Sequence, residues 1–234
     1  MAASSIVVHS EAERRRLADR VPAAKVEVVP HFVEQRPALP DRDASRASLG
    51  VADKRVITLL GHMIKRRGHK LVIEALRELP ADVEALFVGA PLRDREYMVD
   101  QFKAYAVKNG VADRTRFMGF VPEEELERVL AATDVALAPY RSMSASGALA
   151  TLISAGRPIV TSDLSQFREL SAMEPGAFHL FTPYRSEQLA PAIEAALAVA
   201  TDEPDPHVQA LARRLSTARV VDRYVGLYRA AASR

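Results

Sequence analysis

Short apolar runs alternate with amphipathic stretches along most of the chain. Runs rich in valine, isoleucine and leucine indicate buried strands, and the stretches between them carry apolar residues at helical spacing. The predicted strands are 56–60, 83–88, 116–118, 134–138, 158–161 and 177–181, and the predicted helices are 68–79, 95–108, 122–132, 148–155 and 187–199. Strands separated by helices in this way predict an α/β fold with a doubly wound parallel sheet.

A separate β-α-β pattern precedes this series. Residues 5–9 and 26–29 indicate strands, and residues 11–20 indicate a charged helix. Because two strands and one helix cannot build a core, we predict that residues 1–33 are the end of another domain, with a short N-terminal arm as the alternative. Residues 34–52 are rich in proline and charge and are predicted to be a linker.

The main domain is predicted to span residues 53–200 and to be followed by a helical tail over 201–234. Apolar residues at positions 220, 221, 224, 225, 227 and 228 form a stripe along the last helix. An apolar stripe needs a hydrophobic partner, so we expect the tail to cross back onto the domain that owns residues 1–33.

A serine- and glycine-containing turn lies between the fourth and fifth strands of the main domain. Ser144 and Ser146 can cap the apolar helix that follows, and Gly147 allows close approach to its first N–H groups. In a parallel sheet this helix would start at the carboxyl edge of the strands, where its dipole favours a phosphate. The turn therefore indicates a diphosphate site, and an ordinary capped crossover is the equal alternative.

A basic loop follows the first strand of the same domain, in the segment Gly61 to Gly68. Lys65, Arg66 and Arg67 would lie at the same carboxyl edge as the serine turn, where they could clamp a diphosphate. A solvated basic loop is the alternative for this triplet alone. The segment matches no P-loop and the chain no GxSxG elbow, which excludes those kinase and hydrolase sites.

Composition narrows the function further. The 234 residues are 48% hydrophobic, contain no cysteine, and balance 32 basic against 30 acidic side chains. The net charge is only +2, and basic and acidic residues are mixed along the chain, which does not suit a nucleic-acid-binding arm. No nucleic acid is therefore expected as a partner. His62 and His69 have no suitable partners in the pattern for a metal, and none is expected. We expect no transmembrane segment or signal peptide, and a cytoplasmic location.

Several further residues are predicted at the same edge. Glu169 follows the fifth strand and is a candidate functional acid, with a surface or helix-capping acid as the alternative. Phe120 and Val121 follow the third strand and could flank a planar base, although packing is the alternative. Gly89 ends the second strand and is placed with Phe120 and Val121 among the candidate nucleoside-binding residues.

The order of these pieces resembles the C-terminal, donor-binding half of GT-B fold glycosyltransferases. The stretches that carry the resemblance are HSEAERRRL, VEVVPHFVE, VITLLGHMIKRRGHKLVIEAL, RFMGFVPEEELERVLAATDVALAPYRS and SGALATLISAGRPIVTSDLSQFREL. Together they cover nearly the whole chain and are similar to the retaining glycosyltransferase family 4, the glycosyl transferases group 1. The resemblance implies a Rossmann-like donor domain.

The resemblance also implies roles for individual residues. Arg67 takes the position of the phosphate-binding lysine, and Glu169 that of the family's acid after the fifth strand, so both are candidate catalytic residues. The implied diphosphate-binding residues are His62, Lys65, Arg66, Arg67, Ser144, Ser146 and Gly147, and the implied nucleoside-binding residues are Gly89, Phe120, Val121 and Thr151.

Three positions depart from the family pattern. His62 replaces the usual arginine after the first glycine, and Met143 and Thr151 replace the two glutamates that lie eight residues apart. Methionine cannot bind a sugar hydroxyl as a carboxylate does, and threonine would hold a ribose only weakly. These departures leave the donor sugar open.

The resulting hypothesis is retaining transfer of a hexosyl group from a nucleoside diphosphate sugar to a carbohydrate or lipid-linked acceptor. We expect no cofactor or metal, with peripheral membrane contact through the missing domain as an open alternative. Because the acceptor-side groups lie outside the chain, we expect it to bind nucleotide but to transfer nothing on its own. The rival hypotheses are a non-catalytic, degenerate GT-B module and a nucleotide-sugar epimerase.

Overall fold

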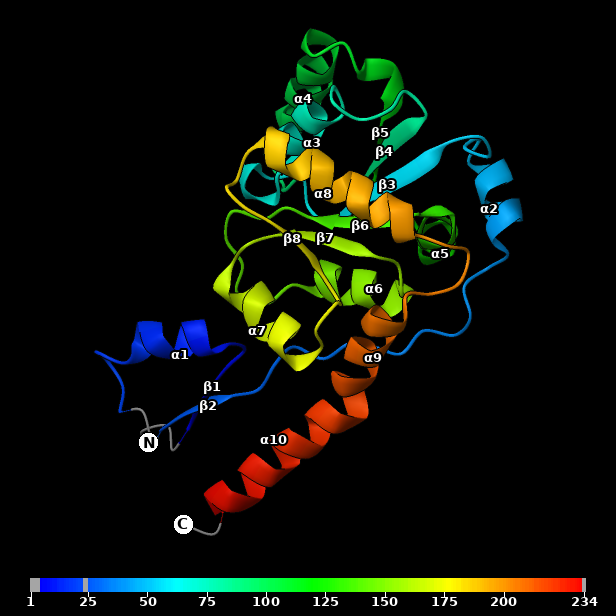
Figure 1. Cartoon of the computed structure of the whole chain (residues 1–234). Coiled ribbons are helices and arrows are strands. Elements are labelled where there is room, and N and C mark those ends of the chain that lie inside the picture. The colour runs from blue at the N-terminus through cyan, green and yellow to red at the C-terminus, as the bar shows by residue number, and fades with distance from the viewer. Residues whose placement is uncertain (1–4, 23–24, 233–234) are drawn as a thin grey trace.

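The computed structural model describes residues 5–22 and 25–232, and these form a six-stranded parallel sheet between helices, with a smaller β-α-β piece beside it (Figure 1). The strands of the main sheet are β3 (Arg55–Leu60), β4 (Val83–Val88), β5 (Thr115–Gly119), β6 (Val135–Ala138), β7 (Ile159–Ser162) and β8 (His179–Phe181). Their order is β5-β4-β3-β6-β7-β8, and each pair runs parallel. The predicted doubly wound, Rossmann-like sheet is therefore confirmed, with its switch point between β3 and β6.

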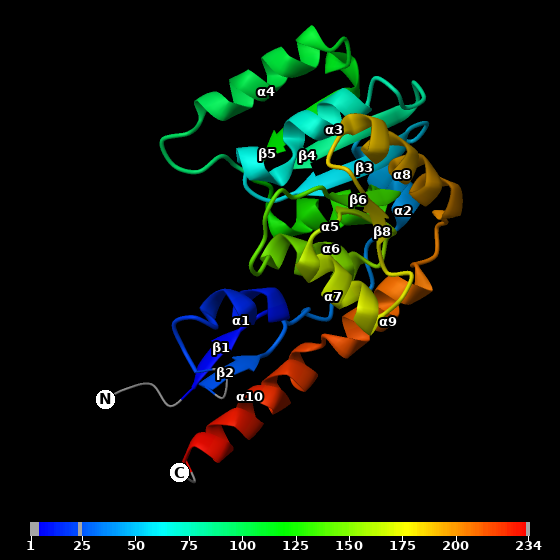
Figure 2. The ribbon, with the colours of Figure 1, turned by 60° about the vertical axis from the view of Figure 1, so that its left-hand side comes forward.

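Helices cover both faces of this sheet (Figures 1 and 2). One face carries α3 (His69–Ala75), α4 (Tyr97–Lys108) and α8 (Ser186–Val199), and the other carries α5 (Glu123–Ala132), α6 (Gly147–Ala155), α7 (Ser165–Met173) and α9 (Pro206–Arg214). Two short 3-10 turns, η2 (Lys65–Arg67) and η3 (Ala112–Arg114), complete the loops before α3 and β5. Because the four central strands β3, β4, β6 and β7 are buried on both faces, their sequences are mostly apolar runs rather than alternating patterns, whereas the edge strands β5 and β8 are only partly buried.

The β-α-β piece at the N-terminus forms its own two-stranded parallel sheet. Its elements are β1 (Ile6–Val8), α1 (Glu11–Leu17) and β2 (Val26–Val28). The long α10 (Thr217–Ala232) leaves the main domain and runs along this piece, and Arg223 on it donates to the carbonyl of Val28 at 3.0 Å (Figure 2). The tail thus reaches residues of the 1–33 segment, while residues 1–4 and 233–234 at the two predicted ends lie outside the described residues.

The segment 34–52, predicted as a linker, contains the helix α2 (Arg42–Ser48), which packs against α5. Asp41 caps α2, and Arg42 and Arg46 both reach the carboxylate of Asp134, which also accepts the N–H of Val56 at 2.6 Å. This segment is therefore a structural part of the main domain. Its sequence did not indicate a helix because α2 is short and its stabilising partner lies far along the chain.

Candidate functional site

Three glycines lie at the carboxyl edge of the sheet. Gly61, Gly89 and Gly119 stand at the ends of three neighbouring strands, where the N–H of Gly61 donates to Val88 at 2.8 Å and that of Gly89 to Gly119 at 2.7 Å. A Cβ at Gly89 would lie 2.3 Å from the carbonyl oxygen of Gly61, so the two loops can approach this closely because no side chain is present. The edge is therefore open for a ligand to lie against the main chain.

The helix α6 begins at the switch point of the sheet. Ser146 is its N-cap, and the Ser146 Oγ accepts the N–H of Leu149 at 3.2 Å. Gly147 is exposed, with no atom within 4 Å of a Cβ built on it. The first turn of an apolar nine-residue helix therefore presents its positive dipole end at this edge.

Arg67 reaches this helix start from the loop after β3. Its Nη1 donates to the Ser146 Oγ at 3.1 Å, and its guanidinium lies 4.3 Å from the centre of the Tyr140 ring. Tyr140 is buried, which raises the pKa of its hydroxyl. The face of its ring packs against the guanidinium in a cation–π contact. Among the described residues Arg67 has no carboxylate partner, so its charge is available for an anion. The structure thus brings the basic loop and the serine turn together.

The other two members of the basic triplet point elsewhere. Lys65 and Arg66 line a separate hollow of about 470 Å³ together with Arg141 and Tyr184, and the Arg141 guanidinium stacks 4.8 Å from the Tyr184 ring. The 3-10 turn η2 separates adjacent side chains by about a third of a turn, so three consecutive residues cannot face one site. The geometry supports only Arg67 of the triplet as a diphosphate ligand.

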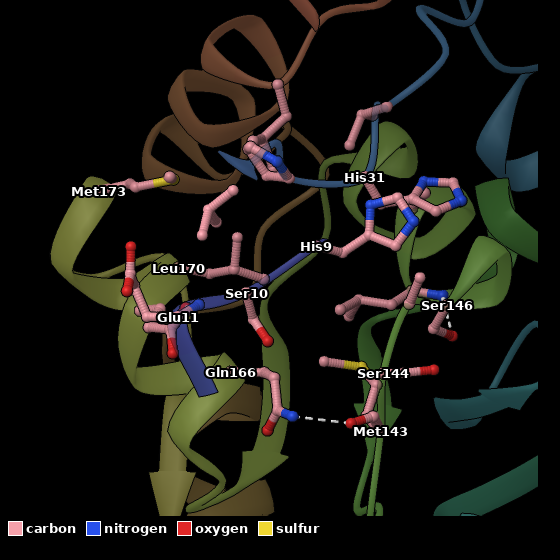
Figure 3. Close-up of a pocket in the computed structure, with 18 of the residues that line it drawn as sticks. His9, Ser10, Glu11, His31, Met143, Ser144, Ser146, Gln166, Leu170 and Met173 are labelled. Carbon is pink, nitrogen blue, oxygen red and sulfur yellow. Dashed lines mark hydrogen bonds between the residues drawn. The ribbon is translucent and has the colours of Figure 1, made fainter. Parts of the chain in front are cut away.

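A hollow lies between the N-terminal piece and helices α6 and α7 (Figure 3). It has a volume of about 530 Å³ and is lined on the domain side by Met143, Ser144 and Ser146. The amide of Gln166 donates to the carbonyl of Met143 at 2.8 Å and holds the serine turn against α7 (Figure 3). The imidazoles of His9 and His31, which belong to the N-terminal piece, line the same hollow and lie near Ser146 (Figure 3).

Glu169 lines the same hollow, but both of its oxygens are engaged. They accept the backbone N–H groups of Glu11 at 2.8 Å and Ala12 at 3.0 Å, in the first turn of α1. This is the helix-capping alternative for Glu169, and it ties α7 to the N-terminal piece. The geometry therefore favours a positioning role for this carboxylate over contact with a substrate.

Replacing Glu169 with alanine is expected to loosen the N-terminal piece, because two half-buried N–H groups would lose their charged acceptor. We expect the free energy of unfolding to fall by about 1–3 kcal/mol and amide exchange in α1 to rise. Hydrogen exchange read by mass spectrometry measures this, with Asp163→Ala as the control, since Asp163 pairs with Arg168 on the same helix. Unchanged protection of α1 in Glu169→Ala would contradict the positioning role.

The remaining predicted residues are scattered along the edge. His62 is exposed, with its Nδ1 3.3 Å from the carbonyl of Ala90. The Phe120 side chain is 81% exposed beside the strand-end glycines, whereas Val121 is buried in the core, which is the packing alternative for that residue. Thr151 lies on α6 in a smaller hollow with Gly147 and His31.

His9 and His31 were not singled out from the sequence. Each follows a strand of the N-terminal piece, at the end of β1 and just beyond β2, and both carboxyl ends face the hollow. Strand-end position was the available signal, but nothing in the sequence showed that this piece faces α6. Within residues 5–22 and 25–232 no three potential metal ligands gather, and no helix is both long and apolar enough to cross a membrane.

The chain has clear similarity to known proteins. The family model for glycosyl transferases group 1 matches residues 54–199. A 2-deoxystreptamine glucosyltransferase of Streptomyces kanamyceticus is 31% identical over 62% of this chain and 36% of its own length. A GDP-mannose-dependent alpha-(1-6)-phosphatidylinositol monomannoside mannosyltransferase of Mycolicibacterium smegmatis is 30% identical over 53% of this chain and 33% of its own length.

A solved structure confirms the fold. Anabaena HepE in complex with UDP and glucose superposes with a TM-score of 0.84 at 22% identity, over 97% of this chain and 64% of that one. The chain thus spans about a third of the length of the two curated relatives and 64% of this structural neighbour. At this identity the superposition establishes a shared architecture.

Proposed function

The chain belongs to the glycosyl transferases group 1 family, and from this premise we propose that residues 53–200 bind a nucleoside diphosphate sugar for retaining transfer of its hexosyl group. The observation that carries the proposal is the contact between Arg67 and Ser146 at the start of α6. It combines a fixed guanidinium, without a carboxylate partner in the described residues, with the positive end of a helix dipole. This pair suits a diphosphate.

The proposed catalysis is electrostatic. The bond between the anomeric carbon and the diphosphate oxygen breaks as the acceptor oxygen bonds to that carbon, and negative charge builds on the leaving phosphate oxygens, which can take the proton that the acceptor hydroxyl loses. Arg67 and the first N–H groups of α6 are positioned beforehand to stabilise that charge, so that little reorganisation is needed. The mechanism uses no protein nucleophile and no metal, and Glu169 contributes by holding the N-terminal piece against α7.

The nucleoside is proposed to lie along the strand-end glycines. The open backbone at Gly61 and Gly89 allows a planar base to approach, and the exposed Phe120 ring offers it an apolar surface. Thr151 would reach the ribose from α6. Met143 stands where the family has a glutamate and can offer the sugar only its carbonyl and thioether, so the donor sugar is selected mainly by other groups.

The names of the relatives suggest which donors to test. HepE was solved with UDP, and the mycobacterial mannosyltransferase is named for GDP-mannose, so uridine and guanosine nucleotides come first. The names also suggest which acceptors to test, since one relative is named for 2-deoxystreptamine, an aminocyclitol, and the other for a phosphatidylinositol mannoside, a lipid-linked sugar.

Calorimetric titration with UDP, GDP and ADP tests the proposal. We expect one of the three to bind with a dissociation constant in the micromolar range or below. No uptake of any of them by the folded chain would favour the non-catalytic, degenerate module. Conversion of the donor sugar without an acceptor would favour an epimerase instead. Transfer to an added acceptor is expected to be absent with this chain alone.

A further inference from the structure

The hollow beside α6 has a second wall, formed by His9 and His31. Their ring centres lie 5.9 Å apart, and both rings project from the N-terminal piece toward the side of the hollow that carries Ser146 (Figure 3). His31 also lines the adjoining hollow with Gly147 and Thr151, so it stands at the junction of the two spaces around the start of α6. Neither imidazole has a role in the mechanism above.

Hydrogen bonds determine which nitrogen of each ring faces a ligand. The Nδ1 of His9 lies 3.0 Å from the carbonyl oxygen of Val29, and the Nδ1 of His31 lies 2.7 Å from that of Phe32. A carbonyl can only accept, so each Nδ1 carries the proton. Within the described residues neither Nε2 has a protein partner. Both Nε2 atoms are therefore available, as acceptors in the neutral ring and as donors in the charged ring.

We propose that His9 and His31 form a phosphate-binding wall of the donor cleft near Ser146, the residue that caps α6 and contacts Arg67, and that they bind most strongly when protonated. This rests on the proposed function, because the ligand is the diphosphate of the same donor. Protonation turns each Nε2 into a charged donor, and a charge-assisted bond to a phosphate oxygen is about twice as strong as a neutral one. Affinity for a diphosphate should therefore rise as the pH falls.

Several charged side chains face the pair of imidazoles. The acidic side chains that face the pair are Glu11, Glu13 and Glu27 on the N-terminal piece, Glu34 after it and Glu169 on α7. The basic ones are Arg14 on α1, Arg36 beside His31 and Arg223 on α10.

Most of these groups already have partners. Glu11 pairs with Arg14 at 2.6 Å, Arg36 pairs with Glu123 at 2.5 Å, and Glu13 accepts the backbone N–H of His9 at 2.8 Å. Glu27 and Glu34 have no cationic partner among the described residues.

Inorganic pyrophosphate tests the proposal without a choice of nucleotide. Its affinity for the chain is measured by calorimetry at pH 6.0 and pH 8.0, in wild type and in His9→Gln and His31→Gln variants. A glutamine amide occupies the place of Nε2 but does not titrate. Relative to the double glutamine variant, we expect wild type to bind about tenfold more tightly at pH 6.0 and within about threefold at pH 8.0.

The asparagine variant separates binding from structure. His31→Asn places an amide near Nδ1, where it can still donate to Phe32, and removes the Nε2 side of the ring. We expect it to lose affinity at pH 6.0 and to differ little from wild type at pH 8.0, where the neutral Nε2 can only accept, while its unfolding temperature stays close to that of wild type. His207→Gln is the matched control. This exposed imidazole lies outside the lining of the hollow and pairs with Glu174 at 3.2 Å, so pyrophosphate binding should not change.

Three outcomes would overturn the inference. If wild type binds no pyrophosphate at either pH, the proposed function and this inference both fail. If binding requires Arg67 but responds to pH equally in wild type and in the double glutamine variant, this inference alone fails. Tighter binding by wild type than by that variant at pH 8.0 alone would assign the imidazoles as acceptors for hydroxyl groups and would equally overturn it.

Discussion

Replacing Arg67 with alanine should lower affinity for the bound nucleoside diphosphate by about 10- to 150-fold, the equivalent of about 1.5–3 kcal/mol for a charged hydrogen-bonding group. The guanidinium is the charge that the structure holds against the start of α6, by a hydrogen bond to Ser146 and by the face of Tyr140. Arg67→Lys should recover only part of the loss, since an ammonium keeps the charge but not the planar fork. Calorimetry with the tightest-binding nucleotide of the panel measures both variants.

The neighbouring residue is the natural control. Arg66 carries the same charge but lines the separate hollow with Arg141 and Tyr184, so Arg66→Ala should change affinity by less than about threefold. Unfolding temperatures of the variants establish that each is folded. Equal losses in Arg66→Ala and Arg67→Ala would mean that the basic loop acts only through its overall charge, and the specific contact at Ser146 would then have no role.

Acid should destabilise the fold through His69. Its ring is buried between the sheet and α4, stacked 4.8 Å from Phe102 and tilted 5.4 Å from Phe87. Burial lowers the pKa of His69 from 6.5 to about 3. The unfolded chain therefore takes up a proton at a pH where the folded chain does not. Stability falls as the pH drops from about 6.5 toward 3, and the part of this loss reached at pH 4.5 is about 2–3 kcal/mol.

Urea unfolding at pH 7.5, 5.5 and 4.5 measures this effect. His69→Leu should cost stability at pH 7.5 through imperfect packing but should remove most of the added loss at pH 4.5. The carboxylates with lowered pKa values, such as Asp82 and Glu174, lose their partners' stabilisation in the same range, but wild type and variant share them. His62→Gln, at an exposed site, should keep the wild-type slope. Parallel slopes in wild type and His69→Leu would exclude His69 as the source.

The sheet could be predicted because its signals are local. The apolar runs of β3 and β4 are buried in full register, and the glycines at their ends are required by the close approach of two backbones. The start of α6 could also be predicted from the sequence, since Ser146 caps it by accepting the N–H of a residue only three positions later. Such features depend on neighbours in the chain, whose spacing any fold of the same class preserves.

Residues that act across long sequence separations could not be placed in this way. Glu169 and the N–H groups of α1 lie more than 150 positions apart, and so do Arg42 and Asp202. The pattern around Glu169 showed an acid after a strand but not that the first turn of α1 would occupy it. The short α2 was hidden for a similar reason: Asp41 caps it locally, but Arg42 and Arg46 are held by Asp134, 92 and 88 positions farther along the chain.

The amino-acid order alone determined the parallel sheet, the edge at which a ligand would bind and the candidate groups along it, because periodicity and strand ends are properties of neighbouring residues. The tertiary structure decided which of those groups meet. It directed Arg67 toward Ser146, and Lys65 and Arg66 toward another hollow. It also bonded Glu169 to the first turn of α1 and placed His9 and His31 in the hollow that Ser146 lines. These outcomes depend on how two distant segments pack, and packing is a sum over contacts that no single stretch of sequence contains.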